Sequence, residues 1–212
     1  MGIKKFLARQ ASHPKGWFGR NITARLFGVT NSKLEDWGFD LMDPDNSTDF
    51  LEIGFGNGRL LEKMGTTIEK GHLAGIDISR DMVRVARQKN RGLIDKGRLE
   101  LQVASVSDIP FPDSSFDLVW TANTIYFWKN PPSDLEEVLR VLRSGGRFFC
   151  AIRSHEEMMK MPPVTSSPEV FRNTYTKDEI GDLLENSGFS NVNVLRSDQS
   201  HFEDLIAIGE KL

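Results

Sequence analysis

From about residue 49 onward, apolar residues occur alternately in short runs and at helical spacing, which predicts alternating strands and helices. Helical spacing is clearest at Leu135, Val138, Leu139 and Leu142, a helix that Gly145-Gly146 should end. Short apolar runs of strand length cover 49–55, 73–78, 99–104, 116–122, 146–152, 190–197 and 202–209. Strands that are mostly apolar and alternate with helices indicate a parallel sheet covered on both faces.

Two helix starts carry recognisable capping residues. Ser79, followed by Asp81, is predicted to be an N-cap. Thr176 and Glu179 have the spacing of a capping box, and Gly188 should end the helix that follows. The last two strand patterns leave no room for a helix between them and should pair as an antiparallel hairpin. The predicted fold is therefore α/β: a doubly wound, mostly parallel seven-stranded sheet with a C-terminal antiparallel hairpin.

The first 45 residues follow no such pattern. Residues 1–34 contain seven Lys or Arg and no Asp or Glu, although the whole chain has a net charge of −3. We expect residues 1–45 to form a helical arm that covers the site, and residues 46–212 to form the domain. A cationic arm could also meet an anionic ligand, an acidic lipid or nucleic acid. A solvated helix face on an acidic body is the simpler interpretation, and because no nucleic-acid motif accompanies the arm, we expect no nucleic-acid partner.

Composition narrows the class of protein. A chain of 212 residues suits one well-cored domain rather than two. Its 39% hydrophobic and 27% charged residues exclude a fibrous or disordered class. The single cysteine, Cys150, excludes an internal disulfide and offers no cysteine metal cluster, and its apolar neighbours predict a buried thiol. With no run near the roughly 20 apolar residues of a membrane span and no signal-peptide core, we expect a cytoplasmic protein without a transmembrane segment.

The stretch with the clearest chemistry is Leu51-Glu-Ile-Gly-Phe-Gly-Asn-Gly58. There a strand pattern breaks into three glycines at alternate positions, and a helical pattern begins at Arg59. Residues without Cβ permit tight turns and let the backbone approach a nucleotide-like ligand. Ligands of open α/β sheets bind beyond the carboxyl ends of the strands. The strand ends that matter are then Gly54–Gly58, Asp77-Ile78, Ser105–Asp108 and Ala122–Trp128.

Two carboxylates sharpen this hypothesis. Asp77 closes the second strand pattern, where its oxygens could accept hydrogen bonds from both hydroxyls of a ribose. Capping of the next helix is the alternative role, but Ser79 is available for it. Glu52 lies in an otherwise apolar strand and needs a polar partner, either a ligand ammonium group or N–H groups of the turn. Because a carboxylate here would oppose the pyrophosphate of a dinucleotide, a cationic ligand suits the site better.

Four blocks of sequence together resemble the class I S-adenosylmethionine-dependent methyltransferases, in particular the group with small-molecule and quinone-biosynthesis C-methyltransferases. They are Glu-x-Gly-x-Gly-x-Gly at 52–58, Gly-Ile-Asp-Ile-Ser at 75–79, Ile-Pro-Phe-Pro-Asp-Ser-Ser-Phe-Asp at 109–117 and Glu-Val-Leu-Arg-Val-Leu-Arg-Ser-Gly-Gly-Arg at 137–147. The likeness runs from about residue 48 to the C-terminus. It implies a Rossmann-like enzyme that uses S-adenosyl-L-methionine as cofactor and methylates a small-molecule acceptor.

The resemblance also implies roles for matching positions. Glu52 would support the amino end of the cofactor, Asp77 would hold the ribose hydroxyls, and Ile78 would pack on the adenine. Ser105 stands where the family commonly has an acid that accepts from the adenine amine, so a hydroxyl oxygen or the Val106 backbone would serve instead. The full implied cofactor set is Glu52, Gly54, Phe55, Gly56, Asn57, Gly58, Asp77, Ile78, Ser105, Val106 and Asn123.

The sequence assigns no catalytic base. Aromatic faces stabilise a cationic sulfur, so Trp17, Tyr126 and Trp128 are candidates to face the substrate, and His155 follows the fifth strand near the expected mouth. Asn130-Pro-Pro132 resembles a motif of amino-methylating enzymes, but it falls too far after the fourth strand and is interpreted as a helix start.

Two other functions remain open from the sequence. One is a sensor or scaffold that binds the same cofactor without turnover, and the other is a nicotinamide-dependent oxidoreductase, which Asp77 alone would fit equally well. The acceptor, the methylated atom and the oligomeric state are not assigned.

Overall fold

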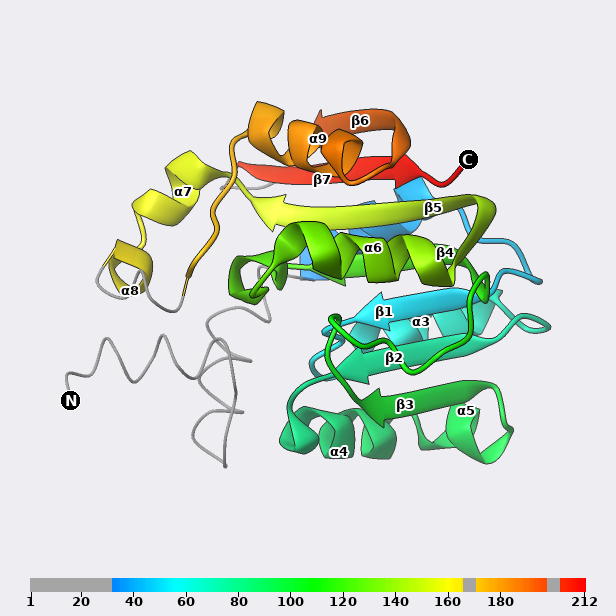
Figure 1. The fold of residues 1–212 in the computed structure, drawn as a ribbon. Coiled ribbons are helices and arrows are strands. Elements are labelled where there is room, and N and C mark those ends of the chain that lie inside the picture. The colour runs from blue at the N-terminus through cyan, green and yellow to red at the C-terminus, as the bar shows by residue number, and fades with distance from the viewer. Residues whose placement is uncertain (1–31, 166–170, 198–202) are drawn as a thin grey trace.

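In the computed structural model, residues 32–165, 171–197 and 203–212 are described. Their strands form one seven-stranded sheet in the order β3-β2-β1-β4-β5-β7-β6 (Figure 1). The strands are β1 (Phe50–Ile53), β2 (Leu73–Asp77), β3 (Leu99–Val103), β4 (Phe116–Ala122), β5 (Leu142–Arg153), β6 (Ser190–Arg196) and β7 (Asp204–Glu210). β1 to β5 pair in parallel, whereas β7 runs antiparallel to both β5 and β6. The predicted parallel sheet and its terminal hairpin are confirmed.

Helices cover both faces of the sheet. Figure 1 shows α6 and α9 in front of it and α3 behind. Alternate residues of each strand point to opposite faces, so two hydrophobic cores form, one beneath α6 and α9 and the other beneath α3, α4 and the helical residues 32–42. The helices are α3 (Arg59–Thr67), α4 (Arg80–Lys89), α5 (Arg91–Asp95), the 3₁₀ turn η1 (Ile125–Phe127), α6 (Pro131–Val141), α7 (His155–Met159), α8 (Pro162–Thr165) and α9 (Lys177–Asn186).

The predicted helix starts are confirmed. The Ser79 hydroxyl accepts the N–H of Met82 at 3.4 Å ahead of α4. Thr176 and Glu179 form the reciprocal capping box of α9, with bonds of 3.3 and 2.8 Å. α6 begins with proline in its first turn, as expected of a residue whose missing N–H costs nothing there.

The predicted end of α6 is wrong. The helix stops at Val141, and Leu142 is already extended and opens β5, where it pairs with Phe116. Leu142 continues the apolar helical spacing, but it is fully buried as a strand residue too, so apolar pattern alone does not separate the two states. Gly145, with φ of 77°, does not end the helix but lies within β5, near an irregularity in its pairing with β4.

The arm predicted over residues 1–45 falls mostly outside the described residues. Its described end, residues 32–42, is helical and buries Leu34 and Met42 in the core beside α3. That the arm covers a site stays a prediction. Cys150, on β5, is fully buried as expected. Within the described residues, no helix has the length and apolar character needed to cross a bilayer.

Candidate functional site

The glycine turn, residues 54–58 between β1 and α3, has a backbone that other residues rarely adopt. Gly54, Gly56 and Gly58 have φ of 74°, 52° and 72°, in the left-handed region that glycine enters without steric cost. A Cβ on Gly54 would lie 2.4 Å from Cγ2 of Thr124, and one on Gly58 would lie 2.7 Å from Nδ2 of Asn90. A Cβ on Gly56 would have no atom within 4 Å. The outer glycines therefore allow close packing, whereas the middle one faces open space.

Asp77 connects the glycine turn to the start of α4. Its Oδ2 accepts the N–H of Gly56 at 3.0 Å, and its Oδ1 accepts the N–H of Ser79 at 2.8 Å. The side chain is only 9% exposed, and burial raises the pKa of its carboxyl to about 6, although these two hydrogen bonds oppose the shift. Ile78 beside it is 43% exposed, unusual for a large apolar side chain. The carboxylate and this apolar surface thus lie together at the end of β2.

Glu52, on β1, is a buried acid with an unsatisfied oxygen. It is 4% exposed, and its Oε2 has no hydrogen-bond partner among the described residues. Burial, followed by the charges of Glu35 and Asp77, raises the pKa of its carboxyl well above the ordinary value, although the backbone N–H of Leu61 opposes the shift. A buried acceptor without a donor is costly. A ligand that brings an ammonium group to this point would supply the missing donor and charge, whereas a phosphate would add a further negative charge.

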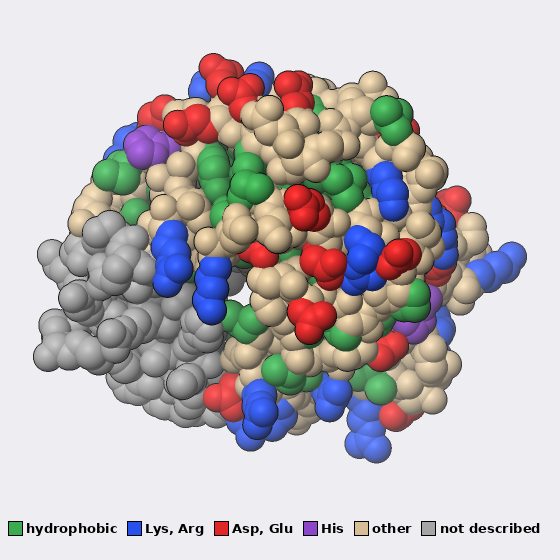
Figure 2. Space-filling model, in the orientation of Figure 1, with side chains coloured by type: hydrophobic (Ala, Val, Ile, Leu, Met, Phe, Trp, Pro, Cys, Tyr) green, Lys and Arg blue, Asp and Glu red, His purple; other side chains and the backbone are tan. Residues whose placement is uncertain are grey.

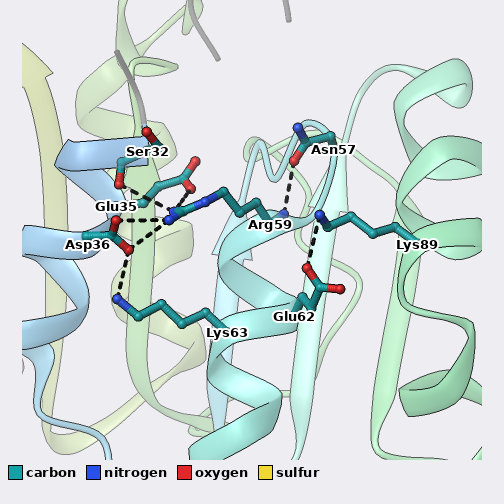
Figure 3. A network of polar contacts seen from close by, with 8 residues as sticks. All are labelled: Ser32, Glu35, Asp36, Asn57, Arg59, Glu62, Lys63 and Lys89. Carbon is teal, nitrogen blue, oxygen red and sulfur yellow. Dashed lines mark hydrogen bonds and ion pairs between the residues drawn. The ribbon is translucent and has the colours of Figure 1, made fainter. Parts of the chain in front are cut away.

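A polar network beside the turn joins residues 32–42 to α3, as Figure 3 shows. Arg59, the first residue of α3, donates to Oε2 of Glu35 at 2.8 Å and to both carboxylate oxygens of Asp36 at 2.9 Å. Lys63 adds a bond of 2.8 Å to Asp36. Burial raises the pKa of the Glu35 carboxyl despite its bond to Arg59. The network holds Glu35 close enough for its charge to act on Glu52.

Sequence reasoning missed this network. Its only signal is that Glu35 and Asp36 are the first acids of the chain, directly after the basic residues 1–34.

Replacing Arg59 with alanine should lower the melting temperature by about 2–4 °C, since paired, half-buried guanidinium bonds contribute about 1 kcal/mol. The matched control is Arg84→Ala, because Arg84 is 67% exposed and pairs with Asp81 on its own helix. We expect Arg84→Ala to lower the free energy of unfolding by less than about 0.5 kcal/mol. Equal melting temperatures for the two variants, measured by differential scanning calorimetry, would contradict the role of Arg59 as a clamp.

The end of β3 reaches the same edge. The Ala104 N–H donates to the Asp77 carbonyl at 3.3 Å, which brings the next residues beside the second strand end. Ser105 is exposed, and its hydroxyl accepts the N–H of Ser107 at 3.2 Å. Val106 is buried in the core beneath α6.

The end of β4 abuts the glycine turn. Thr121 donates its hydroxyl hydrogen to the Ile53 carbonyl at 2.9 Å, and Thr124 is the residue that a Cβ on Gly54 would strike. Asn123 has φ of 55°, a conformation uncommon for a residue other than glycine. Its Oδ1 lies 3.0 Å from the Tyr126 hydroxyl. The carboxyl ends of β1, β2, β3 and β4 therefore lie close together, as expected of parallel strands.

Three of the four residues expected near a substrate are described. Tyr126 is 2% exposed, and its hydroxyl accepts the N–H of Arg153 at 2.5 Å. Trp128 is buried as well and donates from Nε1 to Thr124 at 3.2 Å. Both rings are thus part of the hydrophobic core and expose little surface. Their contact with a substrate stays a prediction.

His155 begins α7, where its Nδ1 lies 2.8 Å from the Thr174 hydroxyl. Trp17 lies outside the described residues. Within them, no three His, Cys, Asp or Glu side chains gather closely enough to hold a metal ion.

Comparison with known proteins identifies relatives of the chain. Residues 51–150 match the family described as "Methyltransferase domain". The Bacillus subtilis (strain 168) protein YrhH, which carries a methyltransferase name, is 33% identical over 131 residues, or 62% of this chain and 71% of the relative. The ubiquinone/menaquinone biosynthesis C-methyltransferase UbiE of Geotalea daltonii is 38% identical over 98 residues, or 46% of this chain and 42% of the relative.

A solved structure is similar as well. It is that of a SAM-dependent methyltransferase from Aquifex aeolicus, which superposes with a TM-score of 0.70 at 25% identity. The match covers 84% of this chain and 89% of that one.

Proposed function

The chain belongs to the class I S-adenosylmethionine-dependent methyltransferases, and from that premise we propose that Glu52, the glycine turn and Asp77 hold the cofactor. The enzyme transfers a methyl group from S-adenosylmethionine to a small-molecule acceptor that is not yet identified.

The observation that carries the assignment is the unpartnered Oε2 of Glu52. A buried carboxylate gains most from a charged donor, and the cofactor has an ammonium group on its methionine part. Glu52 would accept from that group, directly or through a water molecule. The glycine turn lies directly after Glu52, and the open space at Gly56 would admit the methionine part against bare backbone.

Asp77 would hold the ribose. Each carboxylate oxygen has two lone pairs, and each of the two oxygens accepts one backbone N–H. One acceptor position per oxygen therefore remains for a ribose hydroxyl. The exposed side chain of Ile78 would pack on the adenine, and either the Ser105 hydroxyl or the Val106 backbone would meet its polar edge. Phe55, Asn57 and Asn123 complete the proposed set.

Bound cofactor supplies a methyl group on a cationic sulfur, already activated for transfer. The task of the chain is to bind and orient the acceptor and to exclude water. No described side chain is assigned as a general base. We propose that the acceptor lies beyond the ends of β4 and β5, beside residues 123–130 and 171–175. These two segments are joined to each other by hydrogen bonds. The single, buried cysteine favours a reducing compartment such as the cytoplasm, and we propose no nucleic-acid partner.

The test is isothermal titration with S-adenosylhomocysteine. Asp77→Ala should bind at least about 10-fold more weakly, because it removes the ribose acceptor and the tie to Gly56. Asp77→Asn keeps one acceptor oxygen, so its affinity for S-adenosylhomocysteine should lie between that of Asp77→Ala and that of the wild type. Asp95→Ala is the matched control, since Asp95 is 63% exposed and pairs with Arg91 on its own helix. Unchanged affinity in Asp77→Ala, with a normal melting temperature, would remove Asp77 from the cofactor site.

A further inference from the structure

Two basic side chains near the proposed acceptor region have no partner in the part of the chain that the structure describes. Lys129 follows η1, and Arg172 lies in the segment that leads to α9; both are exposed. Among the described residues, neither side chain has an ion pair or hydrogen bond. Other arginines differ: Arg140 and Arg143 each bond to two acids. The positive charges of Lys129 and Arg172 are thus available to bind a ligand.

The backbone fixes these two residues near one another. The Arg172 N–H donates to the Tyr126 carbonyl at 3.0 Å, and Nδ2 of Asn173 donates to the Trp128 carbonyl at 3.0 Å. Tyr126 and Trp128 are buried, so both segments rest on the core. On the face that Figure 2 shows, some Lys and Arg side chains lie beside Asp or Glu side chains and others lie apart from them.

An aromatic pair lies next to the cations in sequence. The rings of Phe127 and Phe171 are tilted at 50° with centroids 5.3 Å apart. Phe127 keeps part of its surface exposed, whereas Phe171 is buried. The same loop contacts the glycine turn through Thr124. An apolar surface, next to two cations without an ion pair among the described residues, therefore lies on the loop that adjoins the proposed cofactor site.

We propose that Lys129 and Arg172 bind an anionic group of the methyl acceptor, and that the apolar body of the acceptor lies against Phe127. The substrate class is thus a small amphipathic anion, such as an aromatic carboxylate, sulfonate or phosphate ester. A guanidinium binds such groups with two parallel N–H bonds, and an ammonium adds a point charge. This inference rests on the proposed function, because it assumes that the acceptor occupies this edge of the sheet.

The experiment compares two fluorescent probes that differ in charge. 8-Anilinonaphthalene-1-sulfonate carries a sulfonate, and N-phenyl-1-naphthylamine has the same ring system without it. The full chain, saturated with S-adenosylhomocysteine, is titrated with each. We expect the wild type to bind the sulfonate at least 5-fold more tightly than the uncharged probe. The double variant Lys129→Gln/Arg172→Gln should lose that preference at least 5-fold and bind the uncharged probe as before.

The matched control is Lys96→Gln/Lys177→Gln, which removes the same charge at two exposed lysines that also have no ion pair among the described residues. We expect it to keep the preference within 2-fold. A wild type that binds both probes equally, or a double variant that retains the preference, overturns the inference. So does binding to phosphatidylserine vesicles that depends on Lys129 and Arg172 while probe binding does not.

Failure of the proposed function remains distinguishable, because it appears as unchanged S-adenosylhomocysteine affinity in Asp77→Ala. The double variant should bind S-adenosylhomocysteine as the wild type does, which also verifies its fold.

Discussion

Replacing Glu52 with glutamine is expected to weaken the binding of S-adenosylhomocysteine by about 100-fold at pH 8, equivalent to about 2.7 kcal/mol. Glutamine keeps nearly the same shape but has no charge with which to meet the ligand ammonium group. Removal of one partner from a buried, hydrogen-bonded charge pair costs about 2–5 kcal/mol. The expected loss lies in this range because the ligand ammonium group would be the partner that Oε2 of Glu52 lacks among the described residues.

The same substitution should stabilise the ligand-free protein, and its effect should depend on pH. Burial and the charges of Glu35 and Asp77 raise the pKa of Glu52 above its ordinary value of 4.5. The folded state therefore holds this proton more tightly than the unfolded state. The resulting stability is fully present below pH 4.5 and is lost as the pH rises through the folded pKa. Glutamine has no proton to lose, so its advantage grows toward high pH.

Calorimetry of the ligand-free proteins between pH 5 and pH 8.5 would show this. Because glutamine cannot carry the charge that burial disfavours, Glu52→Gln should melt above the wild type at pH 8 and close to it at pH 5. Glu100→Gln, a change at an exposed position on β3, should alter neither binding nor melting. If Glu52→Gln bound S-adenosylhomocysteine as tightly as the wild type, Glu52 would not meet the ligand charge.

The parts of the fold that rest on local chemistry follow directly from the sequence. Glycines at positions 54, 56 and 58 after an apolar run predict left-handed backbone, and all three have positive φ. The caps at Ser79 and Thr176 use side chains only a few residues from their partners. The parallel sheet brings the ends of β1 and β2 together, which places Glu52 and Asp77 near one another.

What the sequence could not predict depends on contacts between distant segments. Arg59 bonds to Asp36 across 23 residues, and nothing in their spacing signals that pair. Tyr126 is buried in the core with its hydroxyl bonded to the N–H of Arg153, 27 residues away, and its place after a strand signals neither contact. Leu142 fits helix and strand equally well by its apolar character, so pairing with Phe116 decides its state. The pKa of Glu52 likewise reflects Glu35, whose position is set by tertiary packing.

Gly56→Ala should reduce S-adenosylhomocysteine binding by at least about 50-fold while lowering stability by only about 1–2 kcal/mol. The stability loss arises because φ is 52° at this position, and a residue with Cβ is strained there. The added methyl group would touch no described atom, since nothing lies within 4 Å of it. Its effect on binding would come from the ligand itself, whose methionine part is proposed to lie against the bare backbone.

Gly97→Ala makes this experiment decisive. Gly97 has φ of 69° and also has no atom within 4 Å of an added Cβ, but it precedes β3 at the opposite edge of the sheet. The two variants share the same kind of backbone strain and the same free space, so their melting temperatures should fall by similar amounts, about 2–8 °C. Only Gly56→Ala should lose binding in titration calorimetry. Since strain is common to both, a difference in affinity measures how closely the ligand approaches residue 56. Equal affinities would mean that the cofactor does not approach the glycine turn at this residue.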